Sequence, residues 1–359
     1  MPLVKPFRAL RYGEAAGSLD ALVAPPYDVI SPEDHERLLA ASRYNAVRLV
    51  RPDEPDEAAR LLEEWRAAGI LMREDETAVW LLEEDFEGPD DLRRTRRSLV
   101  ARAALEPYER RIVLPHERSF PKPREGRLRL LRATRTKLSP ILLLHDGPEP
   151  PPAPERPPDL EATLADVTSR LWRLDPAVAE EIRPPLVIAD GHHRYEAALR
   201  FHEEDGSEET AHVLAAFAST RDPSLTIFPT HRVSSSAPAA VNGTKEVAEA
   251  LAALAALPLG QAGYVLVRPE GAELVATHTA GLDTAVVDSL GLEDVRYTPD
   301  AEEAVDAVNA GRAAAAFLVR APTVEQVANA ARAGERMPEK STYFYPKLAA
   351  GLLFSPFDE

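Results

Sequence analysis

The chain has 359 residues, of which 45% are hydrophobic and 28% charged, and this composition excludes a disordered or fibrous protein. It contains no cysteine, so a disulfide framework, a thiolate nucleophile and a cysteine zinc site are excluded. The net charge of −17 argues against nucleic-acid binding, DNA included, because a protein that binds DNA must neutralise phosphates.

Two further features of composition bear on partners. No stretch approaches the ~20 apolar residues of a membrane helix, and residues 1–10 lack the apolar run of a signal peptide. We therefore predict a cytoplasmic protein with no membrane partner. Residues 93–137 are strongly basic, and this stripe either lines a pocket for an anionic small molecule or is a solvated face paired with acidic helices.

The predicted elements start with short extended pieces over residues 1–30, because Pro25 and Pro26 forbid a helix there. Ser31 is expected to cap a helix whose first position is Pro32, and a second helix is expected over 55–68. Apolar patterns then predict strands at 77–83, 97–105, 139–145, 166–174, 186–189 and 213–219, and helices at 127–138 and 192–203.

Residues 147–158 are dense in proline and are expected to form an extended loop. Strands and helices then alternate to the end of the chain, which predicts a mixed α/β or α+β protein. The expected strands lie at 264–268, 273–277 and 313–319, and the expected helices at 245–257, 283–290, 302–309 and 324–332.

The most informative segment is the apolar strand 186–189 followed by Asp190-Gly191-His192-His193-Arg194. A helix that starts here presents unpaired N–H groups and a positive dipole end to an anion, and Gly191 lets a ligand approach the backbone. Arg194 offers a planar fork for phosphate or carboxylate. Asp190 could cap the helix, hold Mg²⁺ or accept a proton, and the histidines could donate to phosphate or act as base. The alternative is a plain helix cap with two surface histidines.

Two further candidates each consist of a histidine followed by a charged residue. His116 and Glu117 follow Pro115. They either act together as a general base or as two metal ligands, or they belong to a surface loop. The pair lacks the second histidine of the zinc-protease motif H-E-x-x-H. His231-Arg232 either closes an anion pocket or leaves Arg232 to pair with surface acids.

A polar cluster near the C-terminal end is the last candidate. It comprises Lys340, Ser341, Thr342 and Lys347, with two tyrosines, and shows neither helical nor strand periodicity. Lysine beside serine or threonine is typical of phosphate contacts, although no Walker P-loop motif is present. The alternative is a C-terminal segment that packs its aromatic side chains into the core.

These segments together resemble the domain-of-unknown-function family 1015 (DUF 1015). The matching pieces occur in order as APPYDVIS, YNAVRL, LEPYERRIVLPHE, KLSPILLL, VIADGHHRYEAAL, FPTHR and MPEKSTYFYPKLAAGLLF. More distantly, residues 187–199 resemble the phosphate-binding box of the ParB/sulfiredoxin-like fold, which includes free L-serine kinases. That resemblance implies that Asp190 binds Mg²⁺ or acts as the nucleophile, and that His192, His193 and Arg194 bind phosphates.

We therefore expect a ParB/sulfiredoxin-like catalytic core over 1–235, an α/β domain over 236–336 and a segment 337–359 that returns to the site. The expected function is phosphoryl transfer to a small metabolite, as in a free L-serine kinase that uses ATP or ADP and Mg²⁺. Catalysis is assigned to Asp190, His193, Glu117 and His116, and Asp190 also to Mg²⁺. Binding of the phosphorylated ligand is assigned to Gly191, His192, Arg194, His231, Arg232, Lys340, Ser341, Thr342 and Lys347. The alternatives are a phosphoserine (or related phosphoester) phosphatase and a non-catalytic nucleotide-binding regulator.

Overall fold

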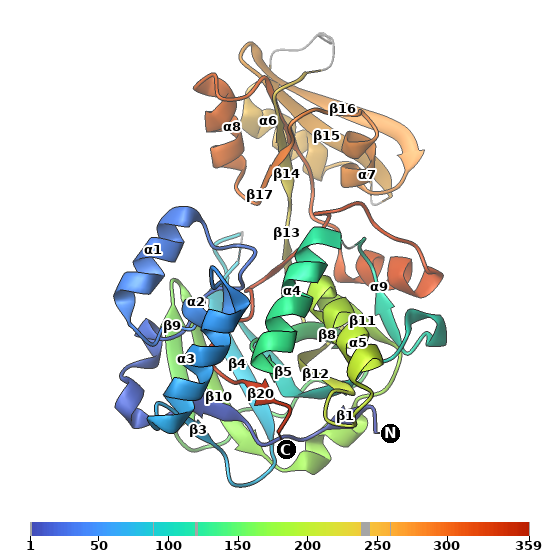
Figure 1. Ribbon diagram of the computed structural model, residues 1–359. Helices are drawn as coiled ribbons and strands as arrows, with labels where there is room; N and C mark the ends of the chain where they lie inside the picture. Colours follow the sequence, from blue (N-terminus) through green and yellow to red (C-terminus); the bar gives the residue numbers. More distant parts are fainter. Residues whose placement is uncertain (1, 89, 119–120, 238–244, 259, 359) are drawn as a thin grey trace. The chain divides into compact units, whose positions relative to one another are not determined.

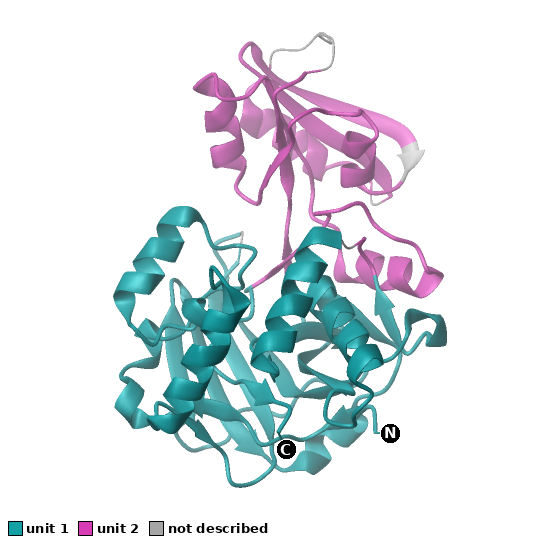
Figure 2. Ribbon diagram, viewed as in Figure 1, with its two compact units in different colours: residues 1–115, 119–225, 346–359 teal, residues 116–118, 226–345 magenta. Residues whose placement is uncertain are grey.

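The computed structural model describes residues 2–88, 90–118, 121–237, 245–258 and 260–358. They form two compact units (Figure 2). Unit 1 comprises residues 1–115, 119–225 and 346–359, and unit 2 comprises 116–118 and 226–345. Unit 2 is therefore an insertion in the chain of unit 1, and it begins before the boundary expected at 236. Both units combine helices with sheets, which confirms the mixed α/β class, whereas the ParB/sulfiredoxin-like core stays a prediction.

Unit 1 is built on a nine-stranded mixed sheet in the order β6–β11–β8–β12–β5–β4–β10–β9, with β1 paired to β5 (Figure 1). β11 runs parallel to β6 and antiparallel to β8, whereas β8 and β12 are parallel. Its strands are β1 (Val4–Lys5), β4 (Val79–Glu87), β5 (Arg93–Ala104), β6 (Val113–Pro115), β8 (Ile141–His145), β9 (Leu160–Leu164), β10 (Val167–Leu174), β11 (Leu186–Asp190) and β12 (His212–Ser219).

Helices α4 and α5 lie side by side over this sheet in Figure 1, and Leu128, Tyr195 and Phe201 join them to the strands in one core. A second core joins the smaller helices to short strand pairs, with Leu49 and Trp65 as large members. The helices are α1 (Pro32–Ala41), α2 (Val47–Val50), α3 (Pro55–Ala67), α4 (Pro121–Thr134) and α5 (His192–Asp205). The short paired strands are β2 (Leu10–Tyr12) with β3 (Leu71–Arg73), and β7 (Thr136–Lys137) with β20 (Ser355–Pro356).

The local signals account for most of these elements. Ser31 caps α1 as predicted, because its side chain accepts a hydrogen bond from the backbone N–H of Asp34 at 3.0 Å. α4 ends at Thr134 rather than 138, because residues 136–137 pair with β20 instead. The proline-dense residues 147–158 contain no helix or strand, as predicted. β9 was not predicted, and it forms a hairpin with β10 around Ala165 at φ 51°.

Unit 2 is built on a five-stranded sheet in the order β16–β15–β18–β14–β17. Leu254 of α6 and Val308 of α8 pack on one face of it, and Val287 of α7 packs on the other. The strands are β13 (Thr226–Phe228), β14 (His231–Ser234), β15 (Gln261–Arg268), β16 (Gly271–Ala280), β17 (Arg296–Thr298), β18 (Ala315–Leu318) and β19 (Tyr343–Tyr345), and β13 pairs with β19. The helices are α6 (Val247–Ala255), α7 (Asp283–Asp288), α8 (Ala301–Asn309) and α9 (Val324–Ala333). No helix among the described residues of either unit is long and apolar enough to cross a membrane.

Candidate functional site

The turn between β11 and α5 is built as the sequence predicts. The first four residues of β11 are apolar and buried. The chain then turns at Gly191, with φ 94° and ψ 28°, before α5 begins at His192. A Cβ atom on Gly191 would lie 2.6 Å from Cγ2 of Ile141, so both the backbone angle and the space require glycine. Gly191 is itself the N-cap and supplies no side chain to the first N–H groups of α5. The start of this helix therefore favours an anion.

Asp190 does not cap α5 but forms an ion cluster at the end of β11. Its Oδ2 accepts a hydrogen bond from Nη2 of Arg194 at 2.6 Å, and its Oδ1 accepts one from Nζ of Lys347. Burial by itself raises the pKa of Asp190, but the charges of Lys347 and Arg194 outweigh it and hold that pKa well below its ordinary value. Asp190 is therefore ionised and engaged through both oxygens.

Arg194 has donors to spare. Its Nη1 donates to Oγ of Ser139 at 3.1 Å and to the carbonyl of Pro140, and its Nη2 donates to Asp190. A guanidinium carries five N–H donors. The Nε–H and one Nη2–H of Arg194 donate to no residue that the structure describes, and Nε lies 3.1 Å from the Cβ position of Gly191. Two donors thus remain beside the start of α5.

Lys347 is held in place by a buried ion pair of the large sheet. Arg96 and Glu84 are 0% and 1% exposed, and Nη2 of Arg96 lies 2.6 Å from Oε2 of Glu84. The same Nη2 donates at 2.9 Å to the carbonyl of Pro346, the residue before Lys347. Sequence reasoning missed this contact, because residues 250 apart in the chain make it.

Tyr27 and Asp28 form a turn after the two prolines of the expected extended piece, and Tyr27 lies near this cluster. The guanidinium of Arg127 lies 3.9 Å above the ring of Tyr27 and donates to the carbonyl of Val50 at 2.7 Å. Burial lowers the pKa of Arg127, and the nearby charge of Arg194 lowers it further. Two guanidinium groups therefore share one neighbourhood, which concentrates positive charge near Gly191.

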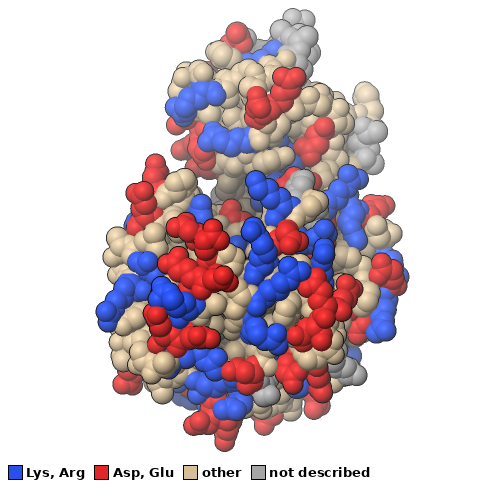
Figure 3. All heavy atoms as spheres, in the orientation of Figure 1, with Lys and Arg blue, Asp and Glu red and all other residues tan. Residues whose placement is uncertain are grey.

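Arg127 comes from the basic stripe, and several other members of the stripe pair with acids. Figure 3 shows Lys and Arg beside Asp and Glu on the visible face of unit 1. Arg132 of α4 lies 2.8 Å from Glu204 of α5, and Arg124 lies 3.3 Å from Glu196. The pairing with acids agrees with the second interpretation of the stripe, and the pocket for an anionic molecule stays a prediction.

The two histidines of the turn differ in exposure. His192 is buried, with 8% of its surface exposed, whereas His193 is half-buried. A cavity of about 50 Å³ adjoins Arg194 on the α4 side and is lined by Arg127, Ser139 and apolar residues of both helices. The cluster around Gly191 therefore has a small adjoining hollow with an apolar wall.

The remaining predicted site residues belong to unit 2, where the first group surrounds His116. His116 is fully buried, and its Nε2 lies 2.9 Å from Oγ1 of Thr342. Oε1 of Glu117 accepts a hydrogen bond from the backbone N–H of Lys340 at 2.8 Å. These bonds fix residues 340–342 against 116–117 within unit 2.

Arg232 is fully buried in unit 2 and uses all five donors inside the chain. Its Nε and Nη2 donate to the carboxylate of Asp288, Nη1 donates to the carbonyls of Thr230 and Lys340, and Nη2 also donates to that of Glu339. The expected pairing with a surface acid is thus present, because Asp288 is exposed while Arg232 is buried.

Two further predicted residues of unit 2 are buried and hydrogen-bonded. Nδ1 of His231 accepts a hydrogen bond from the backbone N–H of Val319 at 3.1 Å, and burial lowers the pKa of His231 to about 4. Oγ of Ser341 lies 3.0 Å from Oγ1 of Thr284. Both side chains are therefore neutral parts of a packed interior.

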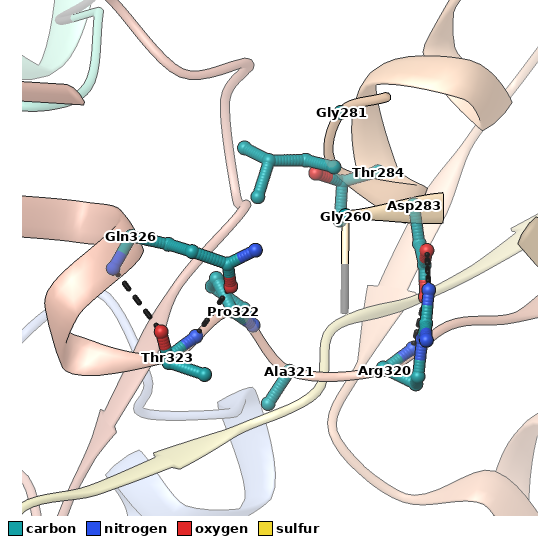
Figure 4. Close-up of a pocket in the computed structure, with 10 residues that line it drawn as sticks. Gly260, Gly281, Asp283, Thr284, Arg320, Ala321, Pro322, Thr323 and Gln326 are labelled. Carbon is teal, nitrogen blue, oxygen red and sulfur yellow. Dashed lines mark hydrogen bonds and ion pairs between the residues drawn. The ribbon is translucent and has the colours of Figure 1, made fainter. Parts of the chain in front are cut away.

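Unit 2 contains a cavity of about 60 Å³ at the starts of α7 and α9 (Figure 4). Nη2 of Arg320 lies 2.8 Å from Oδ1 of Asp283, and Thr323 and Gln326 cap α9 reciprocally. The charged groups of this cavity are thus paired with each other.

The predicted site residues consequently fall into two groups. Asp190 to Arg194 come together with Lys347 in unit 1, and His116 and Glu117 come together with residues 340–342 in unit 2. Arg127, Ser139 and Arg96 were missed. Their type alone could not separate them from the neighbouring arginines and serines of the sequence.

The fit of a metal ion can be tested on the same residues. The described residues contain no group of three or more His, Asp or Glu side chains that could hold a metal. Asp190 offers one carboxylate, and two cations already occupy its oxygens. This donor set does not fit a Mg²⁺ ion held by the protein alone, so the assignment of Mg²⁺ to Asp190 stays a prediction.

Several solved structures are similar at low identity. A free serine kinase in complex with AMP is 15% identical at a TM-score of 0.41 and covers 66% of this chain and 85% of its own. SbnI with a C-terminal truncation from Staphylococcus aureus is 10% identical at 0.40, over 72% and 87%. A conserved hypothetical protein from Pyrococcus furiosus is 16% identical at 0.37, over 66% and 89%.

Comparison with curated proteins gives no match. The sequence profile of a family described as a protein of unknown function (DUF1015) matches residues 4–308, which is most of the chain. The protein therefore belongs to the DUF1015 family.

Proposed function

We propose that the protein is a phosphoryl-transfer enzyme that acts on a small metabolite and binds its phosphorylated ligand at the β11–α5 turn. The observation that carries the proposal is the pair of N–H donors that Arg194 retains beside Gly191 and the uncapped start of α5. Phosphate is the ligand that such a combination of backbone N–H groups and guanidinium fork favours.

The residues of unit 1 would supply binding and charge. The first N–H groups of α5 and the free donors of Arg194 would hold phosphate oxygens, while Lys347 and Arg127 would add positive charge close by. Phosphoryl transfer needs mainly positioning and such charge neutralisation.

Asp190 would accept the proton of the attacking hydroxyl. While Lys347 and Arg194 hold it, its lowered pKa makes it a weak base. A phosphate that draws Lys347 away would raise that pKa. The substrate O–H bond would then break toward Asp190 as its oxygen bonds to phosphorus and the bond from phosphorus to the departing nucleotide oxygen breaks.

Free L-serine is the first substrate to test, because residues 187–199 resemble the box found in free serine kinases. The full chain is incubated with L-serine, Mg²⁺ and either ATP or ADP, and O-phosphoserine is measured by mass spectrometry. We expect product from the wild type and from Arg200→Ala, an exposed control on α5 that pairs with Glu204, and none from Arg194→Ala.

The Asp190–Lys347 pair supports a second candidate, because a carboxylate with both oxygens engaged is suited to a switch as well as to a base. In a non-catalytic regulator, ATP or ADP would raise the melting temperature without any product. Phosphate release from phosphoserine without nucleotide would instead identify a phosphatase. If no metabolite in a panel is turned over and no nucleotide shifts the melting temperature, both candidates fail.

A further inference from the structure

A cavity of about 270 Å³ lies in unit 1 at the carboxyl end of β8, between the proline-dense loop and the turn of 3₁₀ helix over Pro176–Glu181. Its buried lining is apolar apart from one histidine, and its exposed lining carries two acids. The buried members are Leu99, His145, Pro150 and Ile182, and the exposed acids are Glu149 and Glu181. The cavity therefore has an apolar floor and an acidic rim.

His145 has a defined tautomer. Its Nδ1 accepts a hydrogen bond from the backbone N–H of Gly147 at 3.1 Å, and a backbone N–H can only donate. Burial lowers the pKa of His145, which outweighs the opposite effect of Asp146, so the ring is neutral at pH 7. A neutral ring that accepts through Nδ1 carries its hydrogen on Nε2.

The Nε2–H of His145 is a buried donor that no described residue accepts. The side chain is only 3% exposed, and an unsatisfied buried donor costs ~1–3 kcal/mol. Because His145 belongs to the cavity lining, an acceptor that enters the cavity and displaces the lining atoms beside Nε2 would recover that cost. The donor and the cavity are two independent observations that point to one ligand site.

We propose that this cavity binds a small organic molecule with an apolar body, a hydrogen-bond acceptor at its inner end and a positive charge at its outer end. The acceptor bonds Nε2–H of His145, the body packs on Leu99, Pro150 and Ile182, and the charge lies near Glu149 and Glu181. A cavity of ~150 Å³ holds benzene, so this larger one accommodates a substituted ring.

The site is separate from the one at Gly191. β8 runs antiparallel to β11, so its first residue Ile141 lies beside Gly191 whereas its last residue, His145, lies at the opposite end of the strand. At the usual rise of a strand, the two ends are ~13 Å apart. The proposal therefore does not rest on the proposed function and survives its failure.

The probe is 4-(aminomethyl)benzamide, which combines a ring, a carbonyl and an ammonium group. Benzylamine lacks the carbonyl and 4-methylbenzamide lacks the charge. Isothermal titration calorimetry of the full chain should give the highest affinity for 4-(aminomethyl)benzamide. Each of the two truncated compounds should bind about tenfold more weakly. Absence of binding at millimolar concentration, or equal affinity for all three, would overturn the proposal.

The site is located with ¹⁵N spectra of the histidine rings. The Nε2 signal of His145 should shift on addition of the probe, and it should show the proton on Nε2 beforehand. Shifts confined to other histidines would refute the assignment even if binding occurs.

Two variants complete the test. His145→Leu removes the donor and should weaken binding of 4-(aminomethyl)benzamide to the level of benzylamine. Because that variant also loses the bond to Gly147, Ala177→Trp is the second: Ala177 is exposed in the lining, and an indole there fills the cavity with His145 intact. Ala41→Trp, on an exposed residue at the end of α1, is the matched control and should bind as the wild type does. Undiminished binding by Ala177→Trp would overturn the proposal.

Discussion

Arg194 in unit 1 and Arg232 in unit 2 look alike in sequence, because each follows a histidine next to an apolar strand. In the structure they differ in what their donors do. Arg232 is 0% exposed and donates all five N–H groups to acceptors of the same unit, whereas Arg194 keeps two. The comparison teaches that the neighbours of an arginine in sequence mark it only as a candidate for anion binding. The number of its N–H groups already bonded within the protein then distinguishes a structural role from a binding role.

The acceptors of the two arginines show the same contrast. Arg232 bonds the backbone carbonyls of Thr230, Glu339 and Lys340, so it fixes the path of the segment that carries residues 337–342. Arg194 shares the carboxylate of Asp190 with Lys347, an arrangement that a competing anion can open. Substitution of Arg232 should therefore mainly lower the stability of unit 2, whereas substitution of Arg194 should mainly weaken ligand binding in unit 1.

The largest effect is expected from Arg232→Ala. It leaves the buried carbonyl of Thr230 and the part-buried carbonyls of Glu339 and Lys340 without their donor, and each such loss costs about 1–3 kcal/mol. Urea unfolding followed by circular dichroism should show this loss. Arg194→Ala is the comparison and should cost less, because Asp190 keeps Lys347 as a partner, so equal losses would remove the distinction between the two arginines.

Gly191→Ala should have the next largest effect. The left-handed backbone costs ~1–2 kcal/mol with a Cβ, and the close approach to Ile141 adds ~1–3 kcal/mol of overpacking. Gly206→Ala, at the end of α5 with φ 72° and open space around it, is the control for backbone strain alone. If both variants lower the melting temperature equally, the close approach at Gly191 has no energetic weight.

Lys347→Met should weaken ADP binding by about tenfold, because it removes one charge-assisted contact, and should also lower stability, because Asp190 loses one of its two cationic partners. Isothermal titration with ADP measures it. Lys245→Met, which removes an exposed pair with Glu249, controls for net charge and should bind as the wild type does. A Lys347→Met protein with unaltered affinity would place Lys347 outside the binding site.

The smallest effect concerns pH. His231 has a pKa of about 4 in the folded protein against 6.5 ordinarily, so between these values the unfolded chain binds the extra proton and stability falls as pH falls. His231→Gln should lose less stability than the wild type between about pH 7 and pH 5 in urea unfolding. Exposed His278→Gln should follow the wild type. Asp190, with its lowered pKa, keeps its contribution until more acidic conditions.

The sequence predicts the β11–α5 turn almost to the residue, because an apolar run, Asp-Gly and the start of a helix are local signals. It does not predict that Arg127 stacks on Tyr27, since nothing local separates Arg127 from the other arginines of α4. The sequence predicts that a C-terminal segment returns to the site. It does not predict that this segment is divided between the two units, with unit 1 resuming at Pro346. That division depends on Arg96, which is remote in sequence.

The insertion of unit 2 has a consequence for the order of folding during synthesis. β7 pairs with β20, and Asp190 meets Lys347, only after the ribosome has translated all of residues 226–345. At usual elongation rates this interval is on the order of ten seconds. During this interval unit 1 lacks Lys347, so its ion cluster is incomplete. All residues of unit 2 have been synthesised before Lys347 is added.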